Sequence, residues 1–513
     1  IMSRILDAVI IGAGPSALGA SLALSGWRPH YKAGCSVASD ALSNRLSRHL
    51  ELEPSGLITG DAVAALAAGL RGRSNNAPAL LFDALQHPGV DLGWGAQPTC
   101  LELRHEPDAA LSHVFVDANP PGGSWHGMFE ATRTLSPGPW MEVPGFSLAD
   151  HLVASHAMPS AAAVRAAAAR QPRRLVAGYY QAAAAHFGIA RHHRAARVAA
   201  VQWQPSKGDG SDGQSRDGDG DAAWNVQLDD GSPPLRAHSL VLATGTWGRP
   251  RQLGIEGEAL PFVSHRCTEL PATARTLLVV GAGLSASDCV VHNLRRGRTV
   301  VHAFRTRAAE TKVASKFLGP GPAGGMYPEY HALSRAMAAA DEATAADDAA
   351  AASGSAGRAA PQGVPLLGGE YIALPLTELR AIGVDGRCAL DRAARGEGVH
   401  AQSWEAPAVD AVAILVGSTP ELDFLPQAVL DALDAAGPPP DTIDGVKATH
   451  PVFIDVDPYT AEARAVPTLH ALGPLRGDNF ARFAIHDGHG VAAAVRRATR
   501  PSADVSGTCA SGM

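Results

Sequence analysis

Two glycine-rich motifs constrain the fold of this chain more than any other feature of its sequence. Gly12-Ala13-Gly14-Pro15-Ser16-Ala17 follows a short apolar run, and Gly281-Ala282-Gly283-Leu284-Ser285-Ala286 stands in the same setting. In such a strand–turn–helix motif the first glycine allows a tight bend and the second lets a pyrophosphate approach the backbone. The third small residue lets helix and strand pack closely. The helix N-terminus supplies unpaired N–H groups for the phosphates.

Two such motifs far apart in one chain predict two nucleotides bound at once, as in a flavoprotein that takes hydride from a nicotinamide. Strand-like and helix-like segments alternate, which indicates an α/β fold with parallel sheets. We expect two Rossmann-type domains and a small antiparallel meander. The expected FAD domain covers residues 1–258 and 405–513, with insertions at 33–112 and 205–222. The expected NADPH domain covers residues 272–404, with a low-complexity linker at 338–363.

The first motif lacks the acidic residue that usually follows about 20 positions later and holds the ribose. The chain reads Arg28-Pro29-His30-Tyr31-Lys32 there. Either FAD binds without that contact, or an insertion precedes the true second strand. The strand-like run His113–Asp117, followed by Gly122 and Gly123, favours the insertion. Asp117 would then hold the adenosine ribose, and Gly123 would let the backbone approach the cofactor.

The second motif is followed by a strand-like run, Thr299–Phe304, and then by Arg305 and Arg307. An NAD site favours an acidic residue at this place, whereas arginine suits the 2′-phosphate of NADP. NADPH is therefore preferred over NADH. The alternative is that both are ordinary surface arginines.

Composition argues against several other classes of protein. The formal net charge of −7 argues against a chain-wide nucleic-acid surface, and no apolar run approaches the roughly 18 residues of a membrane span. The six cysteines form no CxxC pair, which argues against a redox dithiol of that spacing, and no metal site is expected. Scattered thiols indicate a reducing, cytoplasmic compartment. Ile1 precedes Met2, so a longer precursor with an organelle-targeting segment stays open.

The order of the motifs resembles flavin-dependent monooxygenases with two Rossmann domains. Shared with them are Gly12–Ala17, Gly122-Gly123-Ser124-Trp125, Leu242-Ala243-Thr244-Gly245 and Gly281–Ala286. A closer resemblance is to the oxidative-stress-induced growth inhibitor family, a branch of that superfamily. The segments that carry it span nearly the whole chain: Gly69–Ser74, Leu80–Leu85, Pro121–His126, Leu253–Phe262, Met326–His331, Ile454–Pro458 and Gly473–Phe480.

The resemblance implies an FAD-binding, NADPH-dependent, monooxygenase-like protein tied to growth control under oxidative stress. It would use a small-molecule substrate and O2, and protein partners in growth regulation are a further expectation. The expected FAD contacts are Gly12, Gly14, Pro15, Ser16, Ala17, Asp117, Gly123, Trp125, Thr244, Gly245, Asp478, Asn479 and Phe480. The expected NADPH contacts are Gly281, Gly283, Leu284, Ser285, Ala286, Arg305 and Arg307.

The C-terminal segment fits an element that closes the FAD site. Asp478 would hold the ribityl chain, unless it merely caps the helix predicted at Arg482–Arg497. The N-terminus of that helix would stabilise negative charge on the reduced flavin. Asn479 and Phe480 would lie beside the flavin ring. His126 and Asn479 are the candidate catalytic residues, although a lone histidine such as His126 is more often a packed or solvent-facing residue.

Two departures from the superfamily pattern leave more than one reaction compatible with the sequence. The FxGxxxH signature is reduced to Phe262-Val-Ser-His265, and the flavin-proximal asparagine is absent from the stretch Thr134-Leu135-Ser136. Three functions remain: a monooxygenase, an NADPH oxidase or quinone reductase without coupled oxygenation, and a nonenzymatic FAD-binding regulator.

Overall fold

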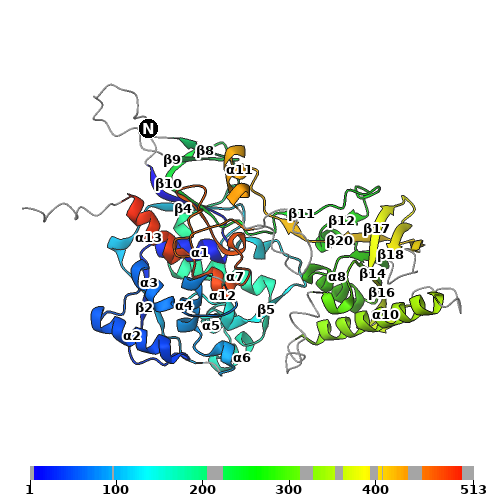
Figure 1. Ribbon diagram of the computed structural model, residues 1–513, viewed down its shortest axis with the longest axis horizontal. Coiled ribbons are helices and arrows are strands. Elements are labelled where there is room, and N and C mark those ends of the chain that lie inside the picture. The colour runs from blue at the N-terminus through cyan, green and yellow to red at the C-terminus, as the bar shows by residue number, and fades with distance from the viewer. Residues whose placement is uncertain are drawn as a thin grey trace, which may run out of the picture. The chain divides into compact units, whose positions relative to one another are not determined.

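The computed structural model describes residues 5–74, 76–94, 97–204, 223–311, 327–352, 362–392, 402–406, 408–436 and 453–499. The chain divides into two compact units (Figure 1). The first unit comprises Ile1–Met128, Arg133–Gly248 and Pro420–Met513, and the second comprises Phe129–Thr132 and Arg249–Thr419. The second unit is thus an insertion in the sequence of the first.

The sheet of the first unit is built around β1 (Leu6–Ile11), which pairs in parallel with β4 (His113–Val116) and β10 (Leu235–Leu242). The strand order is β7-β4-β1-β10-β9-β8, and β22 also pairs with β10. The carboxyl-terminal halves of these three strands are buried and largely apolar, as expected where both faces of a parallel sheet are covered. The remaining strands are β7 (His193–Arg194), β8 (Val198–Gln204), β9 (Ala223–Leu228) and β22 (Leu469–Ala471).

An insertion separates β1 from its neighbour β4. The chain leaves the sheet at β2 (Trp27–Tyr31), which pairs antiparallel with β3 (Leu101–His105). Helices between these strands bury an apolar cluster of their own that includes Leu42 and Phe82. Those helices are α2 (Asp40–Leu52), α3 (Gly60–Ala67) and α4 (Ala77–Gln86). The second parallel strand is therefore β4, and Asp117 follows it directly.

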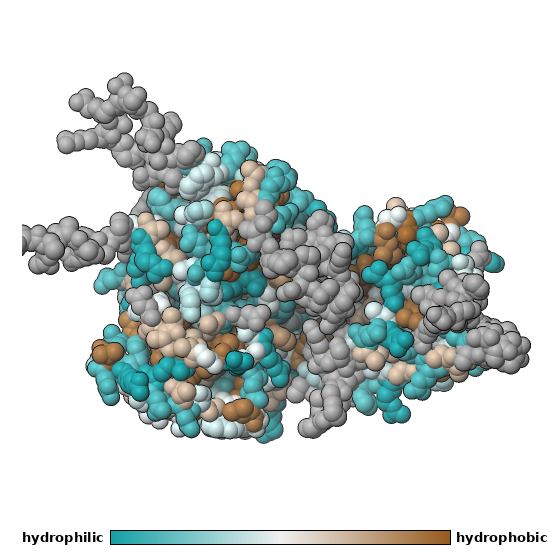
Figure 2. Space-filling view, in the orientation of Figure 1, coloured by the Kyte–Doolittle hydropathy of each residue, from teal (hydrophilic) through white to brown (hydrophobic). Residues whose placement is uncertain are grey.

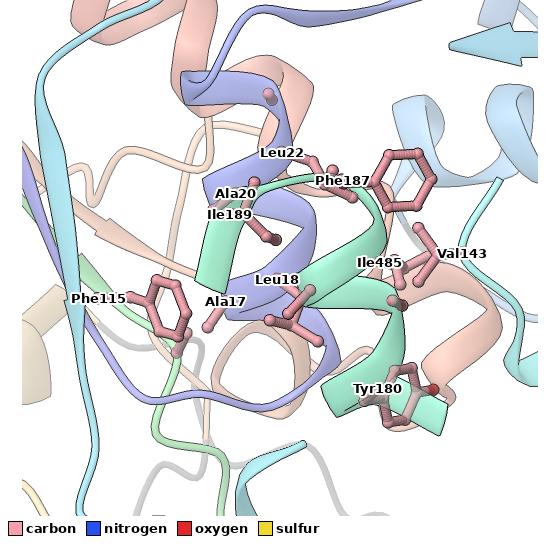
Figure 3. Close-up of a cluster of buried hydrophobic side chains, with 14 of the residues drawn as sticks. Ala17, Leu18, Ala20, Leu22, Phe115, Val143, Tyr180, Phe187, Ile189 and Ile485 are labelled. Atoms are coloured by element: carbon pink, nitrogen blue, oxygen red, sulfur yellow. The ribbon is translucent and has the colours of Figure 1, made fainter. Parts of the chain in front are cut away.

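Helix α1 (Pro15–Leu24) is buried along almost its whole length. Figure 3 shows Tyr180, Phe187 and Ile485 gathered around it, and all three belong to the same apolar core. A Cβ on Gly19 would lie 2.0 Å from the carbonyl oxygen of Ile485, so only glycine allows this approach. The other elements of this unit are β5 (Arg133–Pro137), β6 (Arg170–Pro172), α5 (Leu148–His156), α6 (Ser160–Ala167), α7 (Arg173–His186) and α11 (Gln427–Ala436).

The single C-terminal helix predicted at Arg482–Arg497 is wrong, because the structure has two helices there. These are α12 (Ala481–Ala484) and α13 (Gly488–Thr499), which lie beside α1 (Figure 1). The N–H of His486 bonds to the carbonyl of Phe483, three residues back, so α12 ends in a tighter turn. The break turns the side chain of Asp487 toward the N–H of Gly473.

The second unit has a six-stranded sheet in the order β12-β20-β13-β14-β16-β15. Its centre is β13 (Thr276–Val280), which pairs in parallel with β14 (Thr299–Phe304) and β20 (Ala411–Ile414). Helices α8 (Leu284–Arg295) and α10 (Pro328–Ala352) pack against each other beside it. The remaining elements are β11 (Arg249–Pro250), β12 (Val263–Ser264), β15 (Val364–Leu366), β16 (Gly369–Pro375), β17 (Thr377–Ile382), β18 (Cys388–Arg392), β19 (Gln402–Ala406) and β21 (Ser418–Thr419).

The expected fold class is confirmed, since both units are α/β with parallel strands at their centre and β17-β18-β19 form the antiparallel meander. Residues 338–352 of the expected linker belong to α10, and residues 353–361 lie outside the described residues. The expected insertion at 205–222 also lies outside them.

The described surface mixes polar and apolar side chains. Figure 2 shows apolar residues interspersed with hydrophilic ones on the visible face. Large exposed apolar side chains, such as Leu52, Trp247 and Val384, are far apart in the sequence. None of the described helices is long and apolar enough to cross a lipid bilayer.

A buried ion-pair cluster ties α12 to the insertion. The guanidinium of Arg482 donates from Nε and Nη2 to the two carboxylate oxygens of Asp83 on α4. It also reaches Asp91, with Nη2–Oδ2 at 2.9 Å, and lies 4.8 Å from the ring centroid of Trp140. The side chains of Arg482 and Asp83 are 3% and 6% exposed. Such a pair strongly disfavours removal of one partner, because the other charge stays buried.

Arg482→Ala should therefore lower the free energy of unfolding by about 3–5 kcal/mol. The measurement is urea denaturation followed by circular dichroism. Arg104→Ala is the matched control, because Arg104 pairs with Glu102 in the same insertion while both side chains are over 40% exposed, at 46% and 41%. That control should lose at most about 1 kcal/mol. Equal small losses for the two variants would contradict the anchoring role of Arg482.

Candidate functional site

The first glycine-rich turn connects β1 to α1. Gly12 has φ +122°, and a Cβ there would lie 2.4 Å from the carbonyl oxygen of Ala243. The protein itself therefore requires glycine at this position. Gly14 differs, because it has φ −75° and a Cβ there would meet no described atom within 4 Å. Protein packing gives no reason for glycine at position 14, whereas the close approach of a ligand would give one.

The second turn, between β13 and α8, repeats this geometry. Gly281 has φ +126°, and a Cβ there would lie 2.3 Å from the carbonyl oxygen of Leu415. Gly283 has φ −83°, and a Cβ there would again meet nothing described within 4 Å. The carbonyl of Gly281 lies 2.7 Å from Nε2 of His302, a ring whose pKa is lowered to about 4 by burial. A neutral imidazole thus fixes the turn by donating to that carbonyl.

Both helices begin without a capping side chain. The N-cap residues are Gly14 for α1 and Gly283 for α8, and neither helix has an acidic residue in its first turn. The N–H groups of a first turn have no partner inside the helix. Those at Ser16, Ala17, Ser285 and Ala286 are therefore the donors that a phosphate would meet, next to Pro15 and Leu284.

Asp117 lies beside the first turn. Its Oδ2 accepts the N–H of Ala13 at 3.0 Å, and its Oδ1 accepts the N–H of Asn119 at 2.8 Å. The carboxylate thus braces the glycine-rich turn from the neighbouring strand. Its expected contact with a ribose stays a prediction.

The Gly122-Gly123 pair also lies against this turn. The N–H of Gly122 donates to the carbonyl of Ala13 at 2.7 Å, and a Cβ on Gly123 would lie 2.7 Å from the nitrogen of Gly14. Nε2 of His126 lies 3.0 Å from the carbonyl oxygen of Pro121, so this ring closes its own loop. Trp125 packs on the apolar core. The contact between His126 and Pro121 thus stabilises the loop that contains both residues.

Thr244 and Gly245 follow β10, directly after the Ala243 carbonyl that touches Gly12. Thr244 is half-buried, and Gly245 has φ +69°. In the second unit Arg305 and Arg307 follow β14 and are exposed. The structure thus brings the predicted FAD residues near Gly12 together, and Arg305 and Arg307 follow the strand next to the second turn.

The C-terminal closing segment carries Asp478, Asn479 and Phe480. Asp478 is buried; its Oδ1 accepts the hydroxyl of Ser74 at 2.5 Å, whereas its buried Oδ2 has no partner among the described residues. Burial raises the pKa of this carboxyl. Asn479 is exposed and donates to the carbonyl of Gly477, and Phe480 is half-buried. The closing segment reaches the first turn through Gly473, where a Cβ would lie 2.3 Å from Oγ of Ser16.

Asp487 is a site residue that the sequence analysis missed. Its Oδ2 accepts the N–H of Gly473 at 2.8 Å, and its Oδ1 accepts the side-chain amide of Asn76. Burial raises the pKa of Asp487 to about 7, although Arg476 lies 3.8 Å away. One signal was present, because the Asp487-Gly488 dipeptide interrupts an otherwise helical pattern.

The described part of the chain contains neither a cluster of metal-ligating side chains nor a disulfide bond. It contains no group of three His, Cys, Asp or Glu side chains that could hold a metal ion. The five cysteines described there are free thiols: Cys35, Cys100, Cys267, Cys289 and Cys388.

Comparison with known proteins identifies a family model and solved structures that this chain resembles. The family of pyridine nucleotide-disulphide oxidoreductases matches residues 220–320. The bacillithiol disulfide reductase of Bacillus cereus superposes with a TM-score of 0.51 at 14% identity, covering 96% of this chain and 99% of its own. The ornithine N-hydroxylase of Kutzneria, solved with reduced FAD, NADP+ and L-ornithine, gives a TM-score of 0.50 at 14% identity over 96% and 100%. The fold is thus that of two-domain FAD/NAD(P) oxidoreductases and monooxygenases.

Relatives of higher identity cover nearly the whole chain. Oxidative stress-induced growth inhibitor 1 of Mus musculus is 32% identical in an alignment of 499 positions that covers 94% of this chain and 93% of the relative. Oxidative stress-induced growth inhibitor 2 of Homo sapiens is 30% identical in an alignment of 510 positions that covers 93% and 90% of the two chains. The resemblance found in the sequence is confirmed, and the chain belongs to the oxidative stress-induced growth inhibitor family.

Proposed function

We propose that this chain is an FAD- and NADPH-dependent oxidoreductase of the monooxygenase type, acting on a small molecule with O2. The observation that carries the proposal is the repeated turn. In each unit a strand leads to a glycine, Gly12 or Gly281, that is required by close contact with a backbone carbonyl. A second glycine, Gly14 or Gly283, follows with no described atom near its Cβ position, and then comes a helix without a capping side chain. One such turn is weak evidence, but two of matching geometry fit two dinucleotides.

The first unit suits FAD. Gly14 and the N–H groups at Ser16 and Ala17 would hold the pyrophosphate, and Asp117 would reach the ribose. The buried Oδ2 of Asp478 lacks a donor among the described residues, and a ribityl hydroxyl is a donor of the right kind. These residues therefore fit FAD, and Oδ2 of Asp478 is a buried acceptor available to one of its hydroxyls.

The second unit suits NADPH. Gly283 and the N–H groups at Ser285 and Ala286 would hold its pyrophosphate. The guanidinium of Arg305 is exposed directly after β14, where it would pair with the 2′-phosphate, and Arg307 would add a second positive charge. Bound FAD would supply the acceptor for the nicotinamide hydride and pass electrons on to O2. The part of the protein is to bind and orient both nucleotides and to exclude water.

Two observations favour an oxidase or quinone reductase as the second candidate. On β5 the hydroxyl of Thr134 donates to the carbonyl of Ser136, and neither Leu135 nor Ser136 offers an amide. Nε2 of His265 lies 2.8 Å from Glu258, whose carboxylate also accepts backbone N–H groups, so this histidine stabilises a turn. The chain thus lacks the asparagine of the superfamily pattern, and the histidine that remains of the FxGxxxH signature is engaged within its own turn.

The turns can be tested separately. Gly14→Val should abolish FAD binding, because the added side chain would occupy the space of the pyrophosphate. The protein should still fold, since position 14 has an extended backbone and the added Cβ meets no described atom. Gly283→Val is the matched control; it should keep FAD but no longer be reduced by NADPH under argon. The measurements are the flavin absorption spectrum and far-UV circular dichroism. Stoichiometric FAD in folded Gly14→Val protein would show that this turn is not the FAD site.

The choice of nicotinamide can be tested at Arg305. A charge-assisted pair with a phosphate contributes about 1.5–3 kcal/mol. Arg305→Ala should therefore raise the KM for NADPH by about 10- to 150-fold and leave that for NADH nearly unchanged. Arg387→Ala, at an exposed arginine of the same unit, should change neither. Equal losses for both nucleotides would make Arg305 a structural residue.

The second candidate makes a prediction about coupling. Without an amide at Leu135 or Ser136, oxygen chemistry should be leaky, and most of the NADPH consumed should appear as hydrogen peroxide. An oxygen electrode combined with a peroxidase assay measures the ratio of peroxide to NADPH. If NADPH oxidation instead stays slow until a substrate is added, and then yields no peroxide, the coupled monooxygenase is the correct function.

A further inference from the structure

The insertion between β1 and β4 contacts the closing segment at three buried positions. The hydroxyl of Ser74 donates to Asp478, the side-chain amide of Asn76 donates to Asp487, and Asp83 pairs with Arg482. Ser74, Asn76 and Asp83 are all under 9% exposed, at 8%, 2% and 4%. All three contacts reach residues 478–487, the segment beside Gly473 and the first glycine-rich turn. The insertion therefore packs on the C-terminal closing segment, which is one wall of the proposed flavin site.

Ser74 and Asn76 are both held at the start of α4 by hydrogen bonds. The N–H of Asn76 donates to Oγ of Ser74 at 2.9 Å, and Oδ1 of Asn76 accepts the N–H of Ala79 as the N-cap of α4. Later in the same helix, Asp83 is fixed by Arg482. Ser74 and Asn76 thus cannot move without disturbing a helix that is anchored near both of its ends.

These contacts decide which oxygen of Asp478 is left for another donor. Oδ1 is taken by Ser74, while Oδ2 is buried and has no partner among the described residues. A buried carboxylate oxygen without a donor is strongly disfavoured. A hydroxyl is the fitting partner, because it can donate to a carboxylate and accept from a protonated carboxyl. Ser74 thereby presents one oxygen of Asp478 to a ligand.

We propose that Ser74 and Asn76 are positioning residues of the flavin site, so that the insertion belongs to it. They orient Asp478 and Asp487, and Oδ2 of Asp478 takes hydroxyls of the ribityl chain. The glycine-rich turn holds the ADP half of the cofactor, and the insertion sets the contacts of the flavin half. This inference rests on the proposed function and adds two residues that no motif identifies.

The test compares two probes on the full-length apoprotein. FAD fills both halves of the site, whereas ADP fills only the half at the glycine-rich turn. Ser74→Ala should raise the Kd for FAD about tenfold, the size of effect that loss of one hydrogen bond to a charged group produces. The Kd for ADP should stay unchanged. Binding is measured by flavin fluorescence quenching for FAD and by calorimetry for ADP.

Four further variants complete the test. Ser74→Thr retains the hydroxyl and should restore FAD binding, and Arg71→Ala, at an exposed residue of the same loop, should leave both constants unchanged. In an Asp478→Asn background Ser74→Ala should add no further loss, because the serine acts through that carboxylate. Asn76→Ala should also weaken FAD alone, through Asp487, and it serves if Ser74→Ala does not fold.

The outcomes separate the inference from the function on which it rests. Equal losses for FAD and ADP, or an unchanged Kd for FAD in Ser74→Ala, would overturn the positioning role while leaving the flavin site in place. Wild-type protein that binds ADP but not FAD would overturn the proposed function and this inference together. A loss confined to FAD, with rescue by Ser74→Thr, supports the inference.

Discussion

The close approach of α1 to its neighbours is the constraint on which the rest of the first unit depends. At its start, Gly12 lies against the carbonyl of Ala243, and at its middle Gly19 lies against the carbonyl of Ile485. Backbone-to-backbone contact on two sides explains why this helix consists of small and apolar residues. It also brings three distant parts of the chain, β1, β10 and the C-terminal segment, to one glycine-rich turn.

The buried polar contacts around that turn are the second layer of the architecture. Arg482 with Asp83, and Asn76 with Asp487, join residues about 400 positions apart. Buried charges and amides of this kind add little net stability compared with apolar side chains of the same shape, but they strongly disfavour any other arrangement. They specify where the insertion docks.

The sequence predicts the parts of this fold that are encoded locally. The strand–glycine–helix motifs at Gly12 and Gly281 carry their own geometry, and the run before Asp117 identifies β4 despite the long insertion. The contacts of Asp487 and Arg482 could not be predicted, because no spacing rule connects them to their partners. Asn76 and Asp83 lie in the insertion, and Gly473 lies in the segment before α12. The predicted helix at Arg482–Arg497 was wrong for the same reason. Its pattern is helical apart from the Asp487-Gly488 dipeptide, and the hydrogen bond that the N–H of Gly473 donates to Asp487 is a tertiary contact.

The distribution of hydrogen-bond partners links this architecture to the chemistry. His126 bonds within its own loop, His265 bonds to Glu258, and Thr134 bonds along β5, so these polar groups already serve the protein. Oδ2 of Asp478 is different, because it is buried at the junction of the insertion and the closing segment and has no described donor. A ligand hydroxyl there would complete the hydrogen bonding of the fold as well as the site. A ligand bound there would also stabilise the docked insertion, since the residues that orient Asp478 are the same ones that fix α4.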